Sequence, residues 1–232
     1  MTAAVVGNLP VEELIEIVTK GFEQASTQHS TLNTQPPTLN PEPPFTEIVH
    51  REFIDERLQQ ARLVMVWRVP GLVHLDQTYA LDVLAGILGH GQTSRLVRDL
   101  REEQGLASHI SVSNITHGLQ GIFYISVQCV SENLPHVEAA IAQHILKLNT
   151  ERVTEVEIAR VRTQVANRFI FGNETPSQRA NLYGYYQSLL GSLEPAFNYP
   201  AQIQAQDANH LMQAAQNYLS PEAYGLVILK PA

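Results

Sequence analysis

The chain is poor in the features that mark disulfide-linked, membrane-spanning and nucleic-acid-binding proteins. Its one cysteine, Cys129, excludes an internal disulfide. The 15 Lys and Arg residues are outnumbered by 23 Asp and Glu, and a net charge of −8 argues against a nucleic-acid or anionic-membrane partner. No apolar run approaches the roughly 18 residues that cross a bilayer, so we expect no membrane span. A secretory signal pattern is also missing, and we expect a soluble protein whose compartment stays open.

The usual signatures of a self-contained enzyme are missing as well. None of the nine histidines lies four residues from another, so the helical zinc pairs H-x-x-E-H and H-x-x-x-H do not occur. The serine elbow G-x-S-x-G is absent. Cys129 lies in the apolar run YISVQCV, which is more typical of a buried, inert thiol than of a nucleophile. We therefore predict no catalytic residue and no bound metal in this chain, with a zinc site built from distant histidines as the open alternative.

The N-terminal part is expected to be separate from the rest. Residues 3–7 have the composition of a strand, and a helix is expected to begin near Pro10, which gives a small βα unit over residues 1–25. Residues 26–50 contain five prolines among Ser, Thr, Asn and Gln, a composition typical of an extended linker. A second body is then expected over residues 51–232.

That second body mixes strands and helices. Its sequence is 44% hydrophobic over the whole chain, enough for a sizeable core. The apolar patterns predict strands at 61–69, 108–117, 120–130 and 225–229, and helices at 76–88, 94–103, 135–148, 155–170, 176–190 and 206–218. We predict an α+β fold, with a largely antiparallel sheet and helices packed on one face.

The stretch LGHGQTSRLVRDLREEQGLA, residues 88–107, could be a phosphate loop, a metal site on His90, or a turn. A phosphate loop needs a lysine that the stretch lacks, and His90 has no ligand partner nearby. We therefore interpret Gly89 and Gly91 as a helix stop, His90 as an exposed turn residue, and Arg95 with Asp99 as an ion pair one helical turn apart.

The helix after Thr175 carries the one candidate site. Thr175-Pro176-Ser177-Gln178 has the pattern of a capping box. Arg179 and Tyr186 are seven residues apart on this helix and so project from one face. Together they could hydrogen-bond a peptide carbonyl or an oxyanion. The alternative is a solvated Arg and a half-buried Tyr on an amphipathic helix.

The stretch at 88–107 also carries a resemblance to a known family. Its matching residues are Leu88-Gly89, Gly91, Ser94-Arg95-Leu96, Leu100-Arg101-Glu102 and Gly105-Leu106-Ala107. They resemble the insulinase (pitrilysin-type, or processing-peptidase) family of zinc metallopeptidases. The segment VVGNLPVEELIEIVTKGF is similar, less specifically, to the βα unit that closes the catalytic half of such proteins.

The resemblance implies a clamshell of two related α+β halves, in which the first half binds zinc and the second closes over the peptide. This chain would then hold the βα end of a truncated catalytic domain at 1–25, a linker at 26–50, and the inactive, substrate-closing domain at 51–232. Arg179 and Tyr186 match an Arg and a Tyr that many members offer to the substrate.

The resemblance also implies partners. The zinc of the complete enzyme would come from another segment or subunit, so the chain alone should be inactive. Its partners would be that zinc-bearing domain or subunit and a peptide substrate, with a dimer left open. The alternative function is a non-catalytic family member that serves as an assembly or peptide-binding module.

Overall fold

A computed structural model describes residues 3–26 and 40–232 of the chain. These residues form two compact units. The larger unit comprises residues 41–167 and 199–232, and the smaller one groups the N-terminal segment with residues 168–198. Most of the segment predicted as a linker lies outside the described residues.

The larger unit is built on a five-stranded sheet of order β1-β5-β2-β4-β3. Its strands are β1 (Val49–Ile54), β2 (Ala61–Pro70), β3 (His109–Ile115), β4 (Gln120–Cys129) and β5 (Gly225–Lys230). β1 pairs with β5 in parallel, and the other three pairings are antiparallel. The strand predicted at 61–69 is β2, which occupies the centre of the sheet as its apolar sequence indicates.

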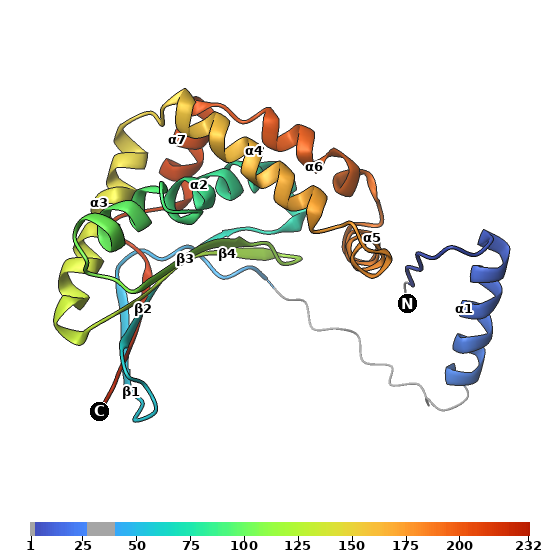
Figure 1. The fold of residues 1–232 in the computed structure, drawn as a ribbon, viewed down its shortest axis with the longest axis horizontal. Coiled ribbons are helices and arrows are strands. Elements are labelled where there is room, and N and C mark those ends of the chain that lie inside the picture. Colours follow the sequence, from blue (N-terminus) through green and yellow to red (C-terminus); the bar gives the residue numbers. More distant parts are fainter. Residues whose placement is uncertain (1–2, 27–39) are drawn as a thin grey trace. The chain divides into compact units, whose positions relative to one another are not determined.

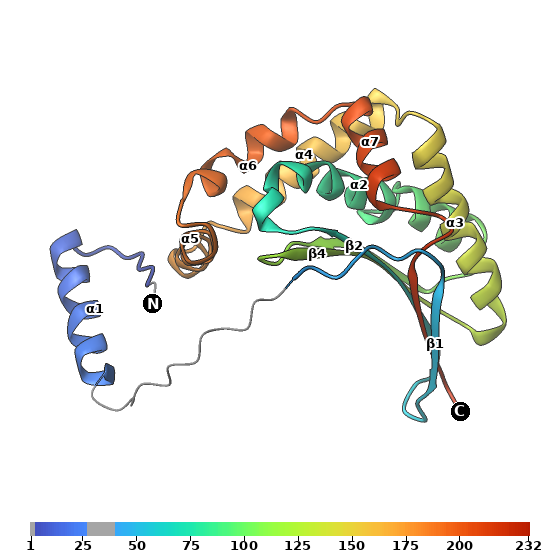
Figure 2. The same cartoon turned by 180° about the vertical axis from the view of Figure 1, so that it is seen from behind.

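Helices cover one face of this sheet (Figure 1). They are α2 (Tyr79–Gly89), α3 (Leu134–Thr150), α4 (Glu155–Phe171) and α7 (Ala208–Tyr218), with short helical turns η1 (Leu72–Gln77) and η3 (Ser131–Asn133). The opposite view shows the same arrangement from behind (Figure 2). The predicted α+β class, with a largely antiparallel sheet and helices on one face, is confirmed.

The core lies between the sheet and these helices. On β2 every second residue is buried, because alternate side chains of a strand point to opposite faces. Trp67 of β2 lies at the centre, with its ring 6.1 Å from that of Phe123 and 5.7 Å from that of Tyr224. Its indole Nε1 donates to the carbonyl of Ser220 at 2.8 Å, so the buried ring leaves no donor unpaired.

The glycines at 89 and 91 end helix α2, as predicted. A Cβ on Gly89 would lie 2.5 Å from Cγ2 of Val112, so only glycine allows the helix end to approach β3 this closely. Gly91 has φ +88°, a left-handed conformation that side chains disfavour. His90 is half-buried and not exposed as expected. Its backbone N–H donates to the carbonyl of Gly86 and caps α2.

The pairing expected between Arg95 and Asp99 is wrong. The helix after Gly91 widens into a π-helical segment, η2 (Val97–Glu103), in which residues four apart no longer stack as in an α-helix. Arg95 instead forms a bidentate pair with Glu157 of α4, at 2.8 and 3.0 Å. Asp99 instead lies 2.7 Å from Nε2 of His144 on α3.

The structure differs from the sequence prediction at three further places. Residues 3–7 form no strand, because no strand of the described chain pairs with them. β1 begins at Val49, inside the range predicted as linker, and Arg68 binds the carbonyl of Pro43 at 2.7 Å. Helix α6 (Glu194–Gln204) was not predicted, and it carries Pro200, which argues against a helix by sequence.

The smaller unit consists mainly of helices. Its elements are α1 (Val11–Ser26), the end of α4, α5 (Pro176–Leu190) and the start of α6. The rings of Tyr183 and Phe197 lie 5.6 Å apart and join α5 to α6. Within residues 3–26 and 40–232, no helix has the length and apolar character needed to cross a bilayer.

Candidate functional site

Helix α5 begins with the predicted capping box. The backbone N–H of Gln178 donates to the Thr175 hydroxyl at 3.2 Å, and the N–H of Thr175 donates to the Gln178 side chain at 3.0 Å. These two bonds satisfy backbone donors that a helix start otherwise leaves unpaired. At the other end Gly191 adopts φ +68° and closes the helix. The local sequence therefore fixes where α5 starts and stops, and with that the positions of residues 179 and 186 on it.

Arg179 is exposed on the first turns of this helix. Its Nε donates to the carbonyl of Asn173 at 3.0 Å, and the Asn173 amide in turn donates to the carbonyl of Phe169 at 2.6 Å. These bonds tie the guanidinium to the turn between α4 and α5. The Arg179 side chain thus has a supported base while it remains in contact with solvent.

Tyr186 is the one buried residue of α5, with 8% of its surface exposed. Its ring meets that of Tyr185 edge-on at 5.4 Å. Tyr185 is exposed, although partial burial still raises the pKa of its phenol. The structure therefore presents Arg179 to solvent and buries Tyr186, an asymmetry that the seven-residue spacing does not reveal.

The described residues do not fit a zinc ion. Across residues 3–26 and 40–232, no three His, Cys, Asp or Glu side chains come together as metal ligands. Zinc sites use about three or four such ligands.

A half-buried carboxylate on α2 was not predicted from the sequence. Asp82 accepts hydrogen bonds from the Asn114 amide at 2.8 Å and from the Tyr199 hydroxyl at 2.9 Å. Burial raises the pKa of Asp82 to about 6, because the charged carboxylate loses solvation that these two bonds only partly replace. No motif marks this cluster, since its members come from α2, β3 and α6.

A charged cavity in the larger unit was not predicted from the sequence either. It has a volume of about 630 Å³ and lies among the segment after α2, the C-terminal half of α3 and the start of α4. Its ten lining residues are Thr93, Arg95, Arg98, His144, Lys147, Glu151, Thr154, Val156, Glu157 and Arg160.

Comparison with known families decides what kind of protein this is. The family model of the peptidase M16 inactive domain matches residues 1–165. The chain belongs to the peptidase M16 inactive-domain family. The resemblance to insulinase-type zinc peptidases is thereby confirmed. The match to the M16 inactive domain ends before α5, so Arg179 and Tyr186 lie outside it.

Relatives of this M16 inactive domain are zinc proteases. The chain is 28% identical over 143 residues to an uncharacterized zinc protease of Rickettsia felis, and the match covers 62% of the chain and 34% of the relative. It is 24% identical over 234 residues to the zinc protease PqqE of Helicobacter pylori, covering 98% of the chain and 50% of the relative. The chain thus spans half or less of the length of these relatives.

The M16 fold is also seen in solved structures. The crystal structure of a protease from Helicobacter pylori matches with a TM-score of 0.83 at 23% identity, over 97% of this chain and 54% of that one. At this identity the likeness establishes the fold alone.

Proposed function

We propose that this chain is the substrate-closing half of a zinc-dependent endopeptidase. The observation that carries the proposal is membership of the M16 inactive-domain family together with the half-length match to zinc proteases. The zinc and its ligands would belong to a catalytic domain or subunit. The role of this chain would be to bind the peptide and hold it against that zinc-bearing partner.

Arg179 and Tyr186 are the residues that we propose for the peptide contact. A guanidinium and a phenol can both donate to a peptide carbonyl, and such donors bind more strongly as the carbonyl oxygen gains charge in the transition state. The hydrogen bond from Arg179 to Asn173 reduces the freedom of the guanidinium before substrate arrives. Tyr186 is buried, so its ring has little freedom to move, and its hydroxyl would donate to the peptide carbonyl from a fixed position.

The test uses the chain reconstituted with its zinc-bearing partner. Arg179→Ala and Tyr186→Phe are each expected to lower kcat by about 10²-fold, the loss typical of one oxyanion donor. Tyr185→Phe is the matched control for the tyrosine, because it removes the same hydroxyl from the adjacent, exposed ring. Ser177→Ala, in the exposed first turn of α5, is the control for the helix itself.

The outcome separates two functions. A kcat that is unchanged in both site variants would refute the assignment of Arg179 and Tyr186. If complex formation and peptide binding by calorimetry also stayed intact, the chain would be a non-catalytic assembly module. A fall in kcat with normal complex formation supports the substrate-closing role.

A further inference from the structure

The charged cavity between α3 and α4 has an excess of cations in an acidic protein. Four of its lining residues are Arg or Lys and two are Glu, whereas the whole chain has a net charge of −8. Two side chains in the lining, Thr93 and Thr154, carry hydroxyls. Cations and hydroxyls gathered around one cavity are the chemistry with which proteins bind oxyanions.

Some of these cations are already neutralised. Glu157 holds Arg95 in the bidentate pair, and the arginine keeps the pKa of that glutamate low, at about 2. Arg98, at the rim, lies 3.4 Å from Glu103 and is mostly exposed. These pairs contribute little net charge to the cavity.

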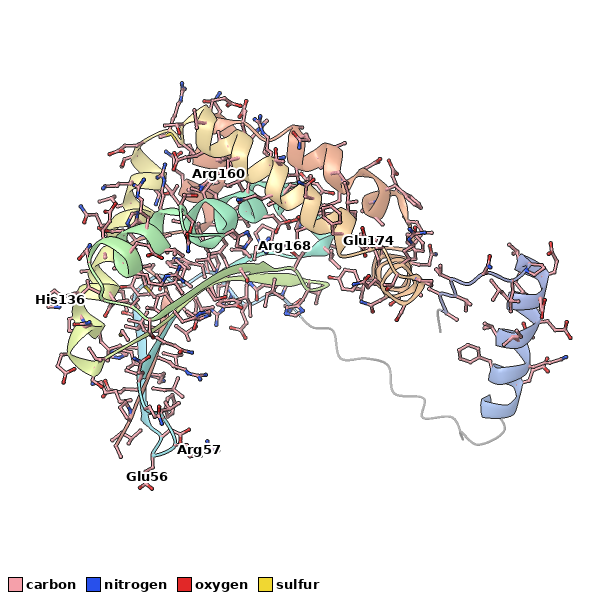
Figure 3. All side chains as sticks on the ribbon, in the orientation of Figure 1. Glu56, Arg57, His136, Arg160, Arg168 and Glu174 are labelled. Carbon is pink, nitrogen blue, oxygen red and sulfur yellow. The ribbon has the colours of Figure 1, made fainter. Side chains whose placement is uncertain are left out.

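Lys147 and Arg160 are the cations that remain. Within the described parts of the chain, neither forms an ion pair with a carboxylate. Arg160 donates to the hydroxyl of Thr93 and so points across the gap between α4 and the segment after α2. Figure 3 shows Arg160 on the helical layer of the larger unit. Glu151 also lines the cavity, and Lys147 helps to lower the pKa of Asp99, but among the described residues neither Lys147 nor Arg160 is held in a close ion pair. Two cations that are free of close ion pairs in one open cavity favour an external anion.

We propose that this cavity binds a small oxyanion with at least two negative charges, held by Lys147 and Arg160. A guanidinium can donate two parallel bonds to a phosphate or carboxylate, and the ammonium adds a point charge. A volume of about 630 Å³ admits a molecule of the size of pyrophosphate or citrate. The site is independent of Arg179 and Tyr186, which lie in the other compact unit.

The test measures binding of two probes to the full chain by calorimetry and thermal unfolding. Sodium pyrophosphate represents the phosphate source and sodium citrate the carboxylate source, each compared with sodium chloride at the same ionic strength. A specific site is expected to raise Tm by a few degrees at a probe concentration of about ten times Kd. A response to pyrophosphate alone or to citrate alone identifies the source.

Substitutions separate the site from general salt effects, because multivalent anions also stabilise proteins by exclusion from the surface. Lys147→Met and Arg160→Gln are each expected to weaken probe binding by about tenfold. Lys147 is exposed, so that variant should fold normally. Arg57→Gln is the matched control, because it removes the same charge from the exposed loop between β1 and β2, at the far end of the larger unit (Figure 3).

Two results would overturn the proposal. One is that neither probe raises Tm above the chloride value. The other is an equal rise in the chain and in Lys147→Met, which would mean that the anions act on the whole surface and not in the cavity.

Discussion

Asp82 shows how a single residue can carry a pH dependence that its sequence context does not suggest. Its carboxylate is half-buried on α2 and is bonded to Asn114 and Tyr199. Its pKa is about 6 in the folded chain, against an ordinary value of 3.8. Between these two pH values the folded chain keeps a proton that the unfolded chain has lost. Stability should therefore fall as pH rises through this window and then level off.

We expect Asp82→Asn to remove this slope. The asparagine carries no charge and can still accept from the Tyr199 hydroxyl. Relative to the unchanged chain, the variant should gain stability from about pH 4 to about pH 7, by no more than roughly 3 kcal/mol for a shift of about two pKa units. Urea unfolding across this pH range measures the effect.

Asp76→Asn is the matched control, because Asp76 is an exposed aspartate on the neighbouring turn η1. Its free energy of unfolding should change little at any pH. A slope that persists in Asp82→Asn, or disappears equally in the control, would show that Asp82 is not the titrating group.

At the scale of elements, the close packing of α2 against α4 depends on one glycine. A Cβ on Gly86 would fall well inside van der Waals contact with Cγ1 of Val161. Val161 is fully buried and β-branched, so its side chain has little freedom to move away. The two helices can approach each other this closely only because residue 86 has no side chain.

Gly86→Ala is accordingly expected to destabilise the chain by about 1–3 kcal/mol through overpacking, although alanine favours helices. Gly21→Ala is the control, because Gly21 is also helical and has nothing within 4 Å of the added Cβ. There the higher helix propensity of alanine should prevail, and the helical circular dichroism should stay equal or increase. Equal effects of the two substitutions would contradict the packing argument.

At the scale of the whole molecule, the chain covers half or less of the zinc proteases that it resembles. We expect the purified chain alone to hydrolyse no fluorogenic peptide, with or without added zinc. The reason is that its sequence lacks the paired histidines of the family, and that the described residues bring no three metal ligands together. Activity should return when a zinc-bearing half is added.

Metal analysis of the purified chain provides the second measurement. Stoichiometric zinc, together with hydrolysis that a chelator abolishes, would mean that the chain holds a complete site of its own. A zinc-free and inactive chain would agree with the proposed role, in which the zinc belongs to a partner.

Much of the fold could be predicted, because helices and strands whose formation depends on residues close in the sequence leave a clear sequence pattern. The nearly continuous apolar run of β2 and the capping box at Thr175 can each be recognised within a short stretch of sequence. α6 was missed because Pro200 argues against a helix locally. Its Tyr199 hydroxyl is held by Asp82, a residue 117 positions away in the chain.

The sequence by itself determined the family, the α+β class and the positions of Arg179 and Tyr186 on one helix. Only the tertiary structure decided that Arg179 is exposed and Tyr186 buried, and that Arg95 pairs with Glu157 and not with Asp99. The physical reason is the range of the interactions. Helix caps and strand periods depend on residues a few positions apart, whereas burial, ion pairing and pKa depend on side chains that only the fold brings together.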